Sequence, residues 1–175
     1  MSVVIRNETG ADVAAIHAVT AAAFLDAPHT DHTEQYIVAA LRESGALSIS
    51  LVAELHGEVV GHVAVSPVTI SDEATDWYGL GPISVRPQNQ GSGIGAALME
   101  GALGRLRELG AGGCVLLGDP ALYSRFGFRP QPQLVLADVP PEYFQALPFG
   151  SSMPEGVVKY HEAFGATGSS LMQES

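Results

Sequence analysis

The feature that most constrains the fold is a glycine-rich segment at residues 86–99, RPQNQGSGIGAALM, midway along a 175-residue chain. Its glycines are Gly91, Gly93 and Gly95. An alanine-rich apolar run follows directly, so the segment is typical of a turn that leads into a helix. Glycines at such a turn let backbone amides approach a ligand, and the helix start favours phosphate or pyrophosphate. A strained turn without a ligand is the alternative interpretation.

Two well-known phosphate-binding motifs do not fit this segment. A nucleotide P-loop needs GxxxxGK[ST], and no lysine lies near these glycines. A dinucleotide-binding fold places its glycine turn after the first strand, whereas this turn follows about the fourth. The glycines therefore point to a phosphate-bearing ligand held in some other fold.

Hydrophobic periodicity predicts a mixed α/β domain with one sheet. Predicted helices cover residues 11–24, 33–43, 94–109 and 120–126. Predicted strands cover residues 3–6, 47–55, 58–70, 77–85, 114–117 and 129–137, with a further strand at 156–160. The last strand could close the sheet or pair across an interface. Prolines at 140, 141 and 148 indicate a loop before that strand.

Composition limits the class of protein. The chain is 46% hydrophobic, which suits one domain over residues 1–175, with an ordered core at about 3–165 and a flexible tail at 167–175. No apolar run is long enough to span a membrane, and no secretory signal is evident. Cys114 is the only cysteine, so we expect a cytoplasmic protein. A net charge of −11 argues against nucleic acid as a partner.

The charge is unevenly distributed. Five of the eight basic residues lie between residues 81 and 130, where there are only three acidic ones. This local excess suits an anionic ligand near the glycines and a cationic ligand arriving elsewhere. An ordinary helix surface would explain it equally well.

The glycine segment resembles motif A of the GNAT superfamily of N-acetyltransferases, [QR]-x-x-G-x-[GA]. Residues 88–93, QNQGSG, fit this pattern, and so does the overlapping register at 90–95, QGSGIG. The preceding ISVRP is similar to the strand exit of that family. Residues 122–128, LYSRFGF, resemble its motif B, Y-x-x-x-G-F. The phrases GHVAVSPVTI, GLGPISV and VVKYHEAF look like the YhbS-like subgroup.

This resemblance covers residues 3–165 and implies the GNAT fold. That fold is an α/β (α+β) architecture with a single mixed, mostly antiparallel central sheet of about seven strands, about four flanking helices, and a fourth strand that splays from the fifth. The implied co-substrate is acetyl-CoA, with no metal. The implied partner is an amine acceptor, either a small molecule, a peptide N-terminus or a lysine, attracted by the acidic surface. Because family members are often dimers, a homodimer is among the expected assemblies.

The resemblance also assigns residues to the cofactor. It places Ile83 and Val85 on the pantetheine arm and the amides of residues 90–95 on the pyrophosphate. The full set of implied cofactor-binding residues is Ile83, Ser84, Val85, Gln90, Gly91, Ser92, Gly93, Ile94, Gly95 and Phe126.

Acetyl transfer needs a neutral amine, a polarised thioester and a proton for the leaving thiolate. By resemblance, Tyr123 occupies the position of the general acid; a packed aromatic is the alternative. The fourth strand, WYGLGPISV, carries no acid, so a protein base is not evident. Glu54 and His62 are candidates, and water-mediated deprotonation is the leading interpretation.

Three other features are better read as structural. His29 and His32 lack further ligands at metal-binding spacing, which argues against zinc. The resemblance places this loop beside the acceptor site and so implies that it gates the substrate. Cys114 lies in an apolar strand and is expected in the core. Asp119 precedes Pro120 and is expected to cap a helix.

Three functions remain open from the sequence. The first is an acetyl-CoA-dependent N-acetyltransferase that uses direct transfer. The second is a non-catalytic module that binds acetyl-CoA or another acyl-CoA as a sensor or interaction partner. The third is transfer to a hydroxyl group instead of an amine.

Overall fold

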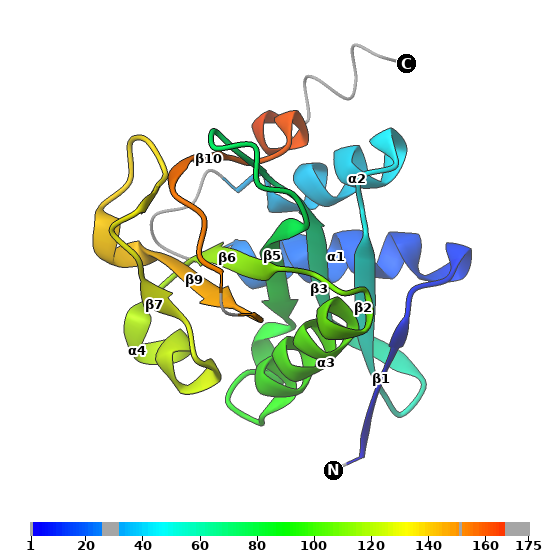
Figure 1. Cartoon of the computed structure of the whole chain (residues 1–175). Helices are drawn as coiled ribbons and strands as arrows, with labels where there is room; N and C mark the ends of the chain where they lie inside the picture. Colours follow the sequence, from blue (N-terminus) through cyan, green and yellow to red (C-terminus); the bar gives the residue numbers. More distant parts are fainter. Residues whose placement is uncertain (1, 26–31, 151, 167–175) are drawn as a thin grey trace.

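The computed structural model describes residues 2–25, 32–150 and 152–166 (Figure 1). A seven-stranded sheet has the order β1-β2-β3-β5-β6-β9-β7, and a three-stranded sheet has the order β4-β10-β8. The strands are β1 Val3–Asn7, β2 Ile49–Leu55, β3 Glu58–Pro67, β4 Thr69–Ile70, β5 Trp77–Val85, β6 Gly113–Leu117, β7 Arg129–Pro130, β8 Leu134–Val135, β9 Phe144–Pro148 and β10 Gly156–Lys159. All neighbours in the larger sheet are antiparallel except β5 and β6.

The helices complete the architecture. The α-helices are α1 Val13–Phe24, α2 Glu34–Ser44, α3 Ile94–Glu108 and α4 Pro120–Tyr123. Short 3-10 turns are η1 Gly10–Asp12, η2 Pro87–Asn89, η3 Ser124–Phe126, η4 Pro141–Tyr143 and η5 Glu162–Gly165. Among the described residues, no helix is long and apolar enough to cross a membrane.

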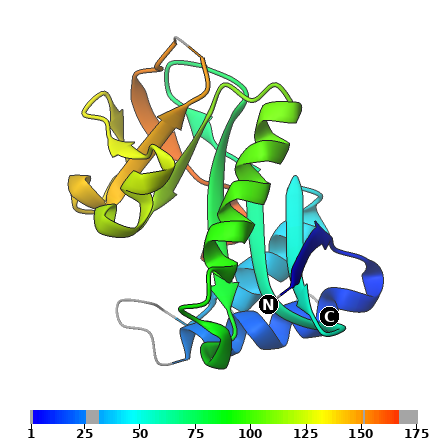
Figure 2. The same cartoon turned by 90° about the horizontal axis from the view of Figure 1, so that it is seen from below.

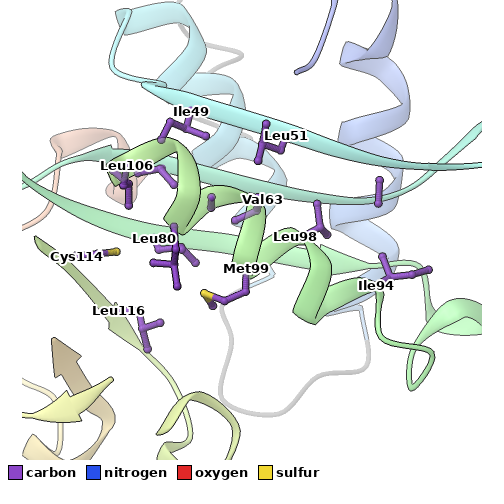
Figure 3. Packing of buried hydrophobic residues seen from close by; sticks show 14 of the residues in the cluster. Ile49, Leu51, Val63, Leu80, Ile94, Leu98, Met99, Leu106, Cys114 and Leu116 are labelled. Atoms are coloured by element: carbon purple, nitrogen blue, oxygen red, sulfur yellow. The ribbon is translucent and has the colours of Figure 1, made fainter. Parts of the chain in front are cut away.

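Helix α3 covers one face of the larger sheet. Its apolar positions recur every three or four residues, so Ile94, Leu98 and Leu106 share one stripe and are buried. Figure 3 shows this stripe over Leu51 and Val63 of the sheet. Burial of each such side chain contributes about 1.5–3 kcal/mol. This contact fixes the start of α3 beside the end of β5.

Helices α1 and α2 cover the opposite face (Figure 1). Ile16 of α1 and Val38 of α2 pack on Val52 and Ala64 of the sheet. Gly45 ends α2 in the left-handed conformation, as its position after the last apolar residue predicts. The sheet is therefore a middle layer between α3 on one side and the α1–α2 pair on the other.

The second sheet forms its own small core beyond β5. Val68, Ile70, Leu134 and Val158 gather there against Trp77 of β5. Figure 2 shows this part of the chain and β9 on the opposite side of α3 from β1 and β2. The molecule thus has two flanks, which meet where β5 pairs with β6.

The predicted fold class is confirmed, but the strands after residue 128 differ from the prediction. The predicted loop contains β9, which lies between β6 and β7 in the larger sheet. The predicted strand at 129–137 is broken into β7 and β8, because a turn closed by Leu134 N–H and the Gln131 carbonyl separates them. The last strand, β10, neither closes the large sheet nor is left unpaired, since it pairs with β4 and β8.

A polar cluster links α2, β2 and β3 to Glu8, which follows β1. Arg42 donates two hydrogen bonds of 2.9 Å to the carboxylate of Glu8. Ser50 also donates to Glu8, so its oxygen accepts from His62 Nε2 at 2.7 Å. His62 is fully buried, and burial lowers its pKa to about 4 from 6.5. At neutral pH the folded chain therefore holds His62 in its neutral form.

This cluster makes stability depend on pH. Since the pKa of His62 is lower in the folded chain than in the unfolded one, unfolded chains bind more protons below pH 6.5. The free energy of unfolding should fall by up to about 3 kcal/mol as pH drops from 6.5 to 4. Urea unfolding of the native chain and His62→Gln at pH 7, 6 and 5 checks this. An equally steep loss in His62→Gln would contradict it.

The junction of the two flanks depends on the missing side chain of Gly113. A Cβ atom there would lie 2.3 Å from the ring of Trp77. Gly113→Ala should therefore lower the free energy of unfolding by about 1–3 kcal/mol. Gly104→Ala is the matched control, because nothing lies within 4 Å of that Cβ position in α3 and alanine favours helix. Equal stabilities of the two variants would show that the ring moves without cost.

Candidate functional site

Strand β5 bends at a bulge. Val63 of β3 faces Ile83, whereas Val65, two residues further on, faces Leu80. Between these two pairs the chain advances by three residues in β5 but by only two in β3. The extra residue of β5 lies near Gly81. A bulge of this kind bends the strand and increases its twist. Gly81 has a φ of +143°, a conformation that glycine adopts readily.

The same strand loses its other neighbour at this point. Parallel pairing of β5 with β6 runs from Trp77 opposite Gly113 to Gly79 opposite Val115, and the described residues show no further pair. The remainder of β5 faces an opening instead of a strand. Peptide groups inside a protein need hydrogen-bond partners, so this edge is suited to an extended polar ligand. The predicted divergence of the fourth and fifth strands is confirmed.

The hydrogen bonds of Val85 and Arg86 fix which backbone groups of β5 face the opening. Arg86 N–H donates to Val60 of β3 at 2.8 Å, so the preceding residue faces away from β3. The Val85 carbonyl accepts from Gln90 Nε2 at 3.0 Å, on the open side. By strand alternation, the backbone groups of Ile83 and the N–H of Val85 face the same way.

The glycine turn lies at the end of this edge. Gly91 and Gly93 have φ values of +80° and +89°, which explains glycine at both positions. Gly93 is the N-cap of α3 and has no side chain to cap it. The N–H groups of the first turn therefore point outward without an intrahelical acceptor.

Gly95 has a different explanation. Its backbone is ordinary helix, and a Cβ atom there would meet only Val85 Cγ2, at a comfortable 3.9 Å. Neither conformation nor internal packing requires glycine at this position. The remaining effect of glycine here is that it leaves the surface beside the first-turn amides of α3 open to a ligand.

A cavity of about 340 Å³ joins this turn to β5. We call it the glycine cavity; its lining includes Ile83, Val85, Gln90, Gly95, Tyr123 and Phe126. Of the five arginines in the region, Arg125 also lines it, and its guanidinium lies 4.8 Å from the centre of the Phe126 ring. Arg125 is therefore the residue among these five that brings positive charge to the glycine cavity.

Several side chains assigned by sequence are used within the protein. Ser84 lines the glycine cavity, but its hydroxyl is buried 3.4 Å from that of Thr20 in α1, and Ile94 is in the core. Gln90 holds the Val85 carbonyl, and Ser92 donates to the Asn89 carbonyl. These residues can offer a ligand only backbone groups or partial contacts.

Tyr123 is held at the end of α4. Asp119 caps this helix, accepting from Ala121 N–H at 2.9 Å, as expected from the Asp-Pro pair. The Tyr123 ring packs where Gly118 lacks a side chain; a Cβ there would lie 2.3 Å from it. Burial, and then the charge of Asp119, raises the pKa of Tyr123 above its usual value. Its phenol therefore stays protonated at neutral pH.

A second cavity of about 430 Å³ lies on the other side of Tyr123. We call it the apolar cavity, because it is lined mainly by aliphatic and aromatic side chains of α1, α2, β5, β6 and the region after β10. Tyr123 and Ile83 line both cavities. The carboxylate-bearing residue Glu34 is also among the described residues that line the apolar cavity. The sequence predicted Glu34 only as part of a helix, since no motif links α2 to the opening beside β5.

Neither candidate base lines these cavities. Glu54 is ion-paired with Arg6 at 3.0 Å, on the β1 side of the sheet. His62 is fully buried in the cluster with Ser50 and Glu8. The structure gives no support to either residue as a direct base.

The remaining sequence candidates are placed as follows. His29 lies outside the described residues, and His32 Nδ1 is 2.8 Å from the Phe24 carbonyl. Within residues 2–25, 32–150 and 152–166, no group of three or more His, Cys, Asp or Glu side chains could hold a metal ion. Cys114 is fully buried, as expected, and burial raises its pKa.

Comparison with known proteins places this geometry in a family. The sequence profile of the acetyltransferase (GNAT) domain matches residues 4–131, well over half of the chain. The curated sequence of the uncharacterized N-acetyltransferase YhbS from Escherichia coli K12 is 44% identical over 97 residues, which are 55% of this chain. The alignment spans 58% of that relative, so little more than half of its length is matched.

Two crystal structures are similar over nearly the whole chain. A GNAT family acetyltransferase from Brucella melitensis, solved with acetyl-CoA, is 48% identical with a TM-score of 0.83, covering 93% of this chain and 98% of that one. YhbS from Escherichia coli, solved with CoA, is 35% identical with a TM-score of 0.86, covering 95% and 93%. The chain therefore belongs to the GNAT family of acetyltransferases.

Proposed function

We propose that this protein is an acetyl-CoA-dependent N-acetyltransferase that moves an acetyl group directly to a primary amine. The observation that carries the proposal is the unpaired edge of β5, which runs from the glycine turn to the apolar cavity. Tyr123 lies where the two cavities meet. This arrangement provides a place for each substrate and a proton donor between them.

Coenzyme A would occupy the glycine cavity. The outward N–H and C=O groups of Ile83 and the N–H of Val85 suit the amides of the pantetheine arm. The amides of residues 91–96 suit the pyrophosphate, because the start of α3 is uncapped and carries partial positive charge. The acetyl-CoA and CoA bound by the relatives from Brucella melitensis and Escherichia coli support this assignment.

The chemistry assigns Tyr123 as general acid. The amine nitrogen attacks the thioester carbonyl carbon, the carbon–sulfur bond breaks, and Tyr123 donates its phenolic proton to the departing thiolate. The amine loses its protons to solvent, as the sequence favours, and neither Glu54 nor His62 lines the cavities. The raised pKa of Tyr123 keeps the donor form present over the working pH range.

Gly95→Asp tests the cofactor site without straining the fold. An aspartate in the first turn of a helix is favourable for stability, but its charge would repel a pyrophosphate. Calorimetric titration with acetyl-CoA should therefore show at least a tenfold loss of affinity, with stability unchanged. Gly104→Asp, in the same helix and with nothing within 4 Å of its Cβ position, should bind normally. Equal affinities of the two variants would contradict the assignment.

Tyr123→Phe tests the proposed acid. We expect kcat to fall by about 10²–10⁴-fold, the usual contribution of a proton donor, with acetyl-CoA affinity within about twofold. Gly118→Ala should lower kcat in the same direction, because its Cβ displaces the Tyr123 ring. Thiol release in an acceptor screen measures both. An unchanged kcat in Tyr123→Phe would remove Tyr123 from the mechanism.

A non-catalytic acyl-CoA sensor is the second candidate. Apart from Glu34, the described residues that line the two cavities include no evident base for the amine proton. This observation favours a sensor that does not catalyse transfer. Tight acetyl-CoA binding without thiol release for any amine or hydroxyl acceptor would favour this candidate.

A further inference from the structure

We infer that Gln145 of β9 is a positioning residue that holds Tyr123 at the junction of the two cavities. Gln145 acts through the backbone of Gly118, against which the Tyr123 ring packs. The role rests on the proposed function, because the place of the phenol matters for turnover only if Tyr123 is the proton donor.

Gln145 is a polar residue in an apolar place. Its side chain is fully buried, and its register partner in β6, Leu116, lines the apolar cavity. Register partners share a face of the sheet, yet Gln145 itself lines neither cavity. Its Oε1 is buried with no hydrogen-bond partner in the described part of the chain. Because a buried amide costs free energy that an apolar side chain would avoid, the contact of its Nε2 needs an explanation.

That nitrogen holds Gly118. Gln145 Nε2 donates to the Gly118 carbonyl at 3.0 Å, and the Gly118 N–H donates to the Tyr143 carbonyl at 2.9 Å. Both hydrogen-bonding groups of Gly118 are therefore tied to β9 or to the residue before it. Gly118 lies between Leu117, the last residue of β6, and Asp119, the N-cap of α4. Gln145 thus fixes the point at which the chain leaves the sheet for α4.

Gly118 in turn determines where the Tyr123 ring can lie. A Cβ atom at Gly118 would be 2.3 Å from Cε2 and 2.8 Å from Cδ2 of Tyr123, so the ring lies directly against the glycine backbone. The Tyr123 N–H donates to the Asp119 carbonyl at 3.3 Å, which ties the tyrosine to the same short segment. Movement of Gly118 would therefore move the phenol. Proton transfer needs hydrogen-bond distance, and a misplacement of about 1 Å can cost about 100-fold in rate.

Gln145→Met, made in the native chain and in Tyr123→Phe, tests whether the two residues act together. Methionine is similar in length to glutamine and has no donor. Thiol release from saturating acetyl-CoA is followed with hydroxylamine as a small acceptor and corrected for the uncatalysed reaction. We expect kcat to fall about tenfold or more in the native chain, but less than about twofold in Tyr123→Phe. Equal losses in the two backgrounds would overturn the inference.

Cofactor binding and a matched variant identify a general disturbance of the fold. Calorimetric affinity for acetyl-CoA should stay within about twofold in Gln145→Met, because Gln145 lines neither cavity. Ser66→Ala is the control, since Ser66 of β3 is also buried and its hydroxyl has no partner among the described residues. This control should change neither kcat nor affinity. An affinity loss in Gln145→Met that matches its loss of kcat would contradict a positioning role.

Gln145→Glu at pH 6 tests the hydrogen bond itself. A buried carboxyl group has a raised pKa and stays protonated, so its O–H can donate to the Gly118 carbonyl. We expect kcat within about threefold of the native value at the same pH. A loss as large as that of Gln145→Met would show that the donor is not what matters.

Ultraviolet titration of tyrosine gives a result that does not depend on turnover. The difference between each chain and its Tyr123→Phe counterpart isolates the ionisation of Tyr123. Burial raises the pKa of Tyr123 in the native chain, and Gln145→Met should lower this pKa toward its usual value as the ring gains access to water. An unchanged pKa would overturn the positioning of Tyr123. A lowered pKa with unchanged kcat would support the positioning and contradict Tyr123 as the proton donor of the proposed function.

Discussion

The loss of pairing between β5 and β6 after Gly79 and Val115 is the constraint on which the rest of the site depends. A sheet normally satisfies its own peptide groups, and interruption of a central ladder is costly unless something else supplies the partners. Here the bulge near Gly81 turns β5 away from β6 and leaves its open edge beside a helix start. Two sets of outward backbone groups then line one opening.

Rigid packing holds that opening in place. The stripe of Ile94, Leu98 and Leu106 fixes α3 on the sheet, so the glycine turn cannot drift from the end of β5. On the other flank, Gln145 is fully buried in β9 and donates to the Gly118 carbonyl at 3.0 Å, next to the position where Tyr123 packs. The ligand-facing groups therefore rest on well-packed elements on both sides of the gap.

The sequence predicted the parts of the fold that obey local rules. Periodic apolar residues indicated α3, and Asp119 with Pro120 indicated α4, because these signals act within one helix. The strand β9 was missed because FQALP is short, ends in proline and has a polar residue, Gln145, in second place. Its strand identity comes from pairing with β6 and β7, which no local pattern encodes.

The site was predicted unevenly for the same reason. The glycines and Tyr123 lie in motifs with recognisable spacing, and the structure brings both to one pair of adjoining cavities. Glu34 carries no motif, and only the packing of α2 over the opening places it at the apolar cavity. Glu54 and His62 looked suitable as isolated residues, but ion pairing and burial engage them elsewhere.

Amide hydrogen exchange, resolved by NMR with and without acetyl-CoA, tests the central claim most directly. If the open edge of β5 and the start of α3 hold the coenzyme, exchange should slow at Ile83, Val85 and residues 93–96, and stay unchanged in β1 and β2. If acetyl-CoA binds while these amides keep their rates and others slow, the unpaired edge is not the cofactor site.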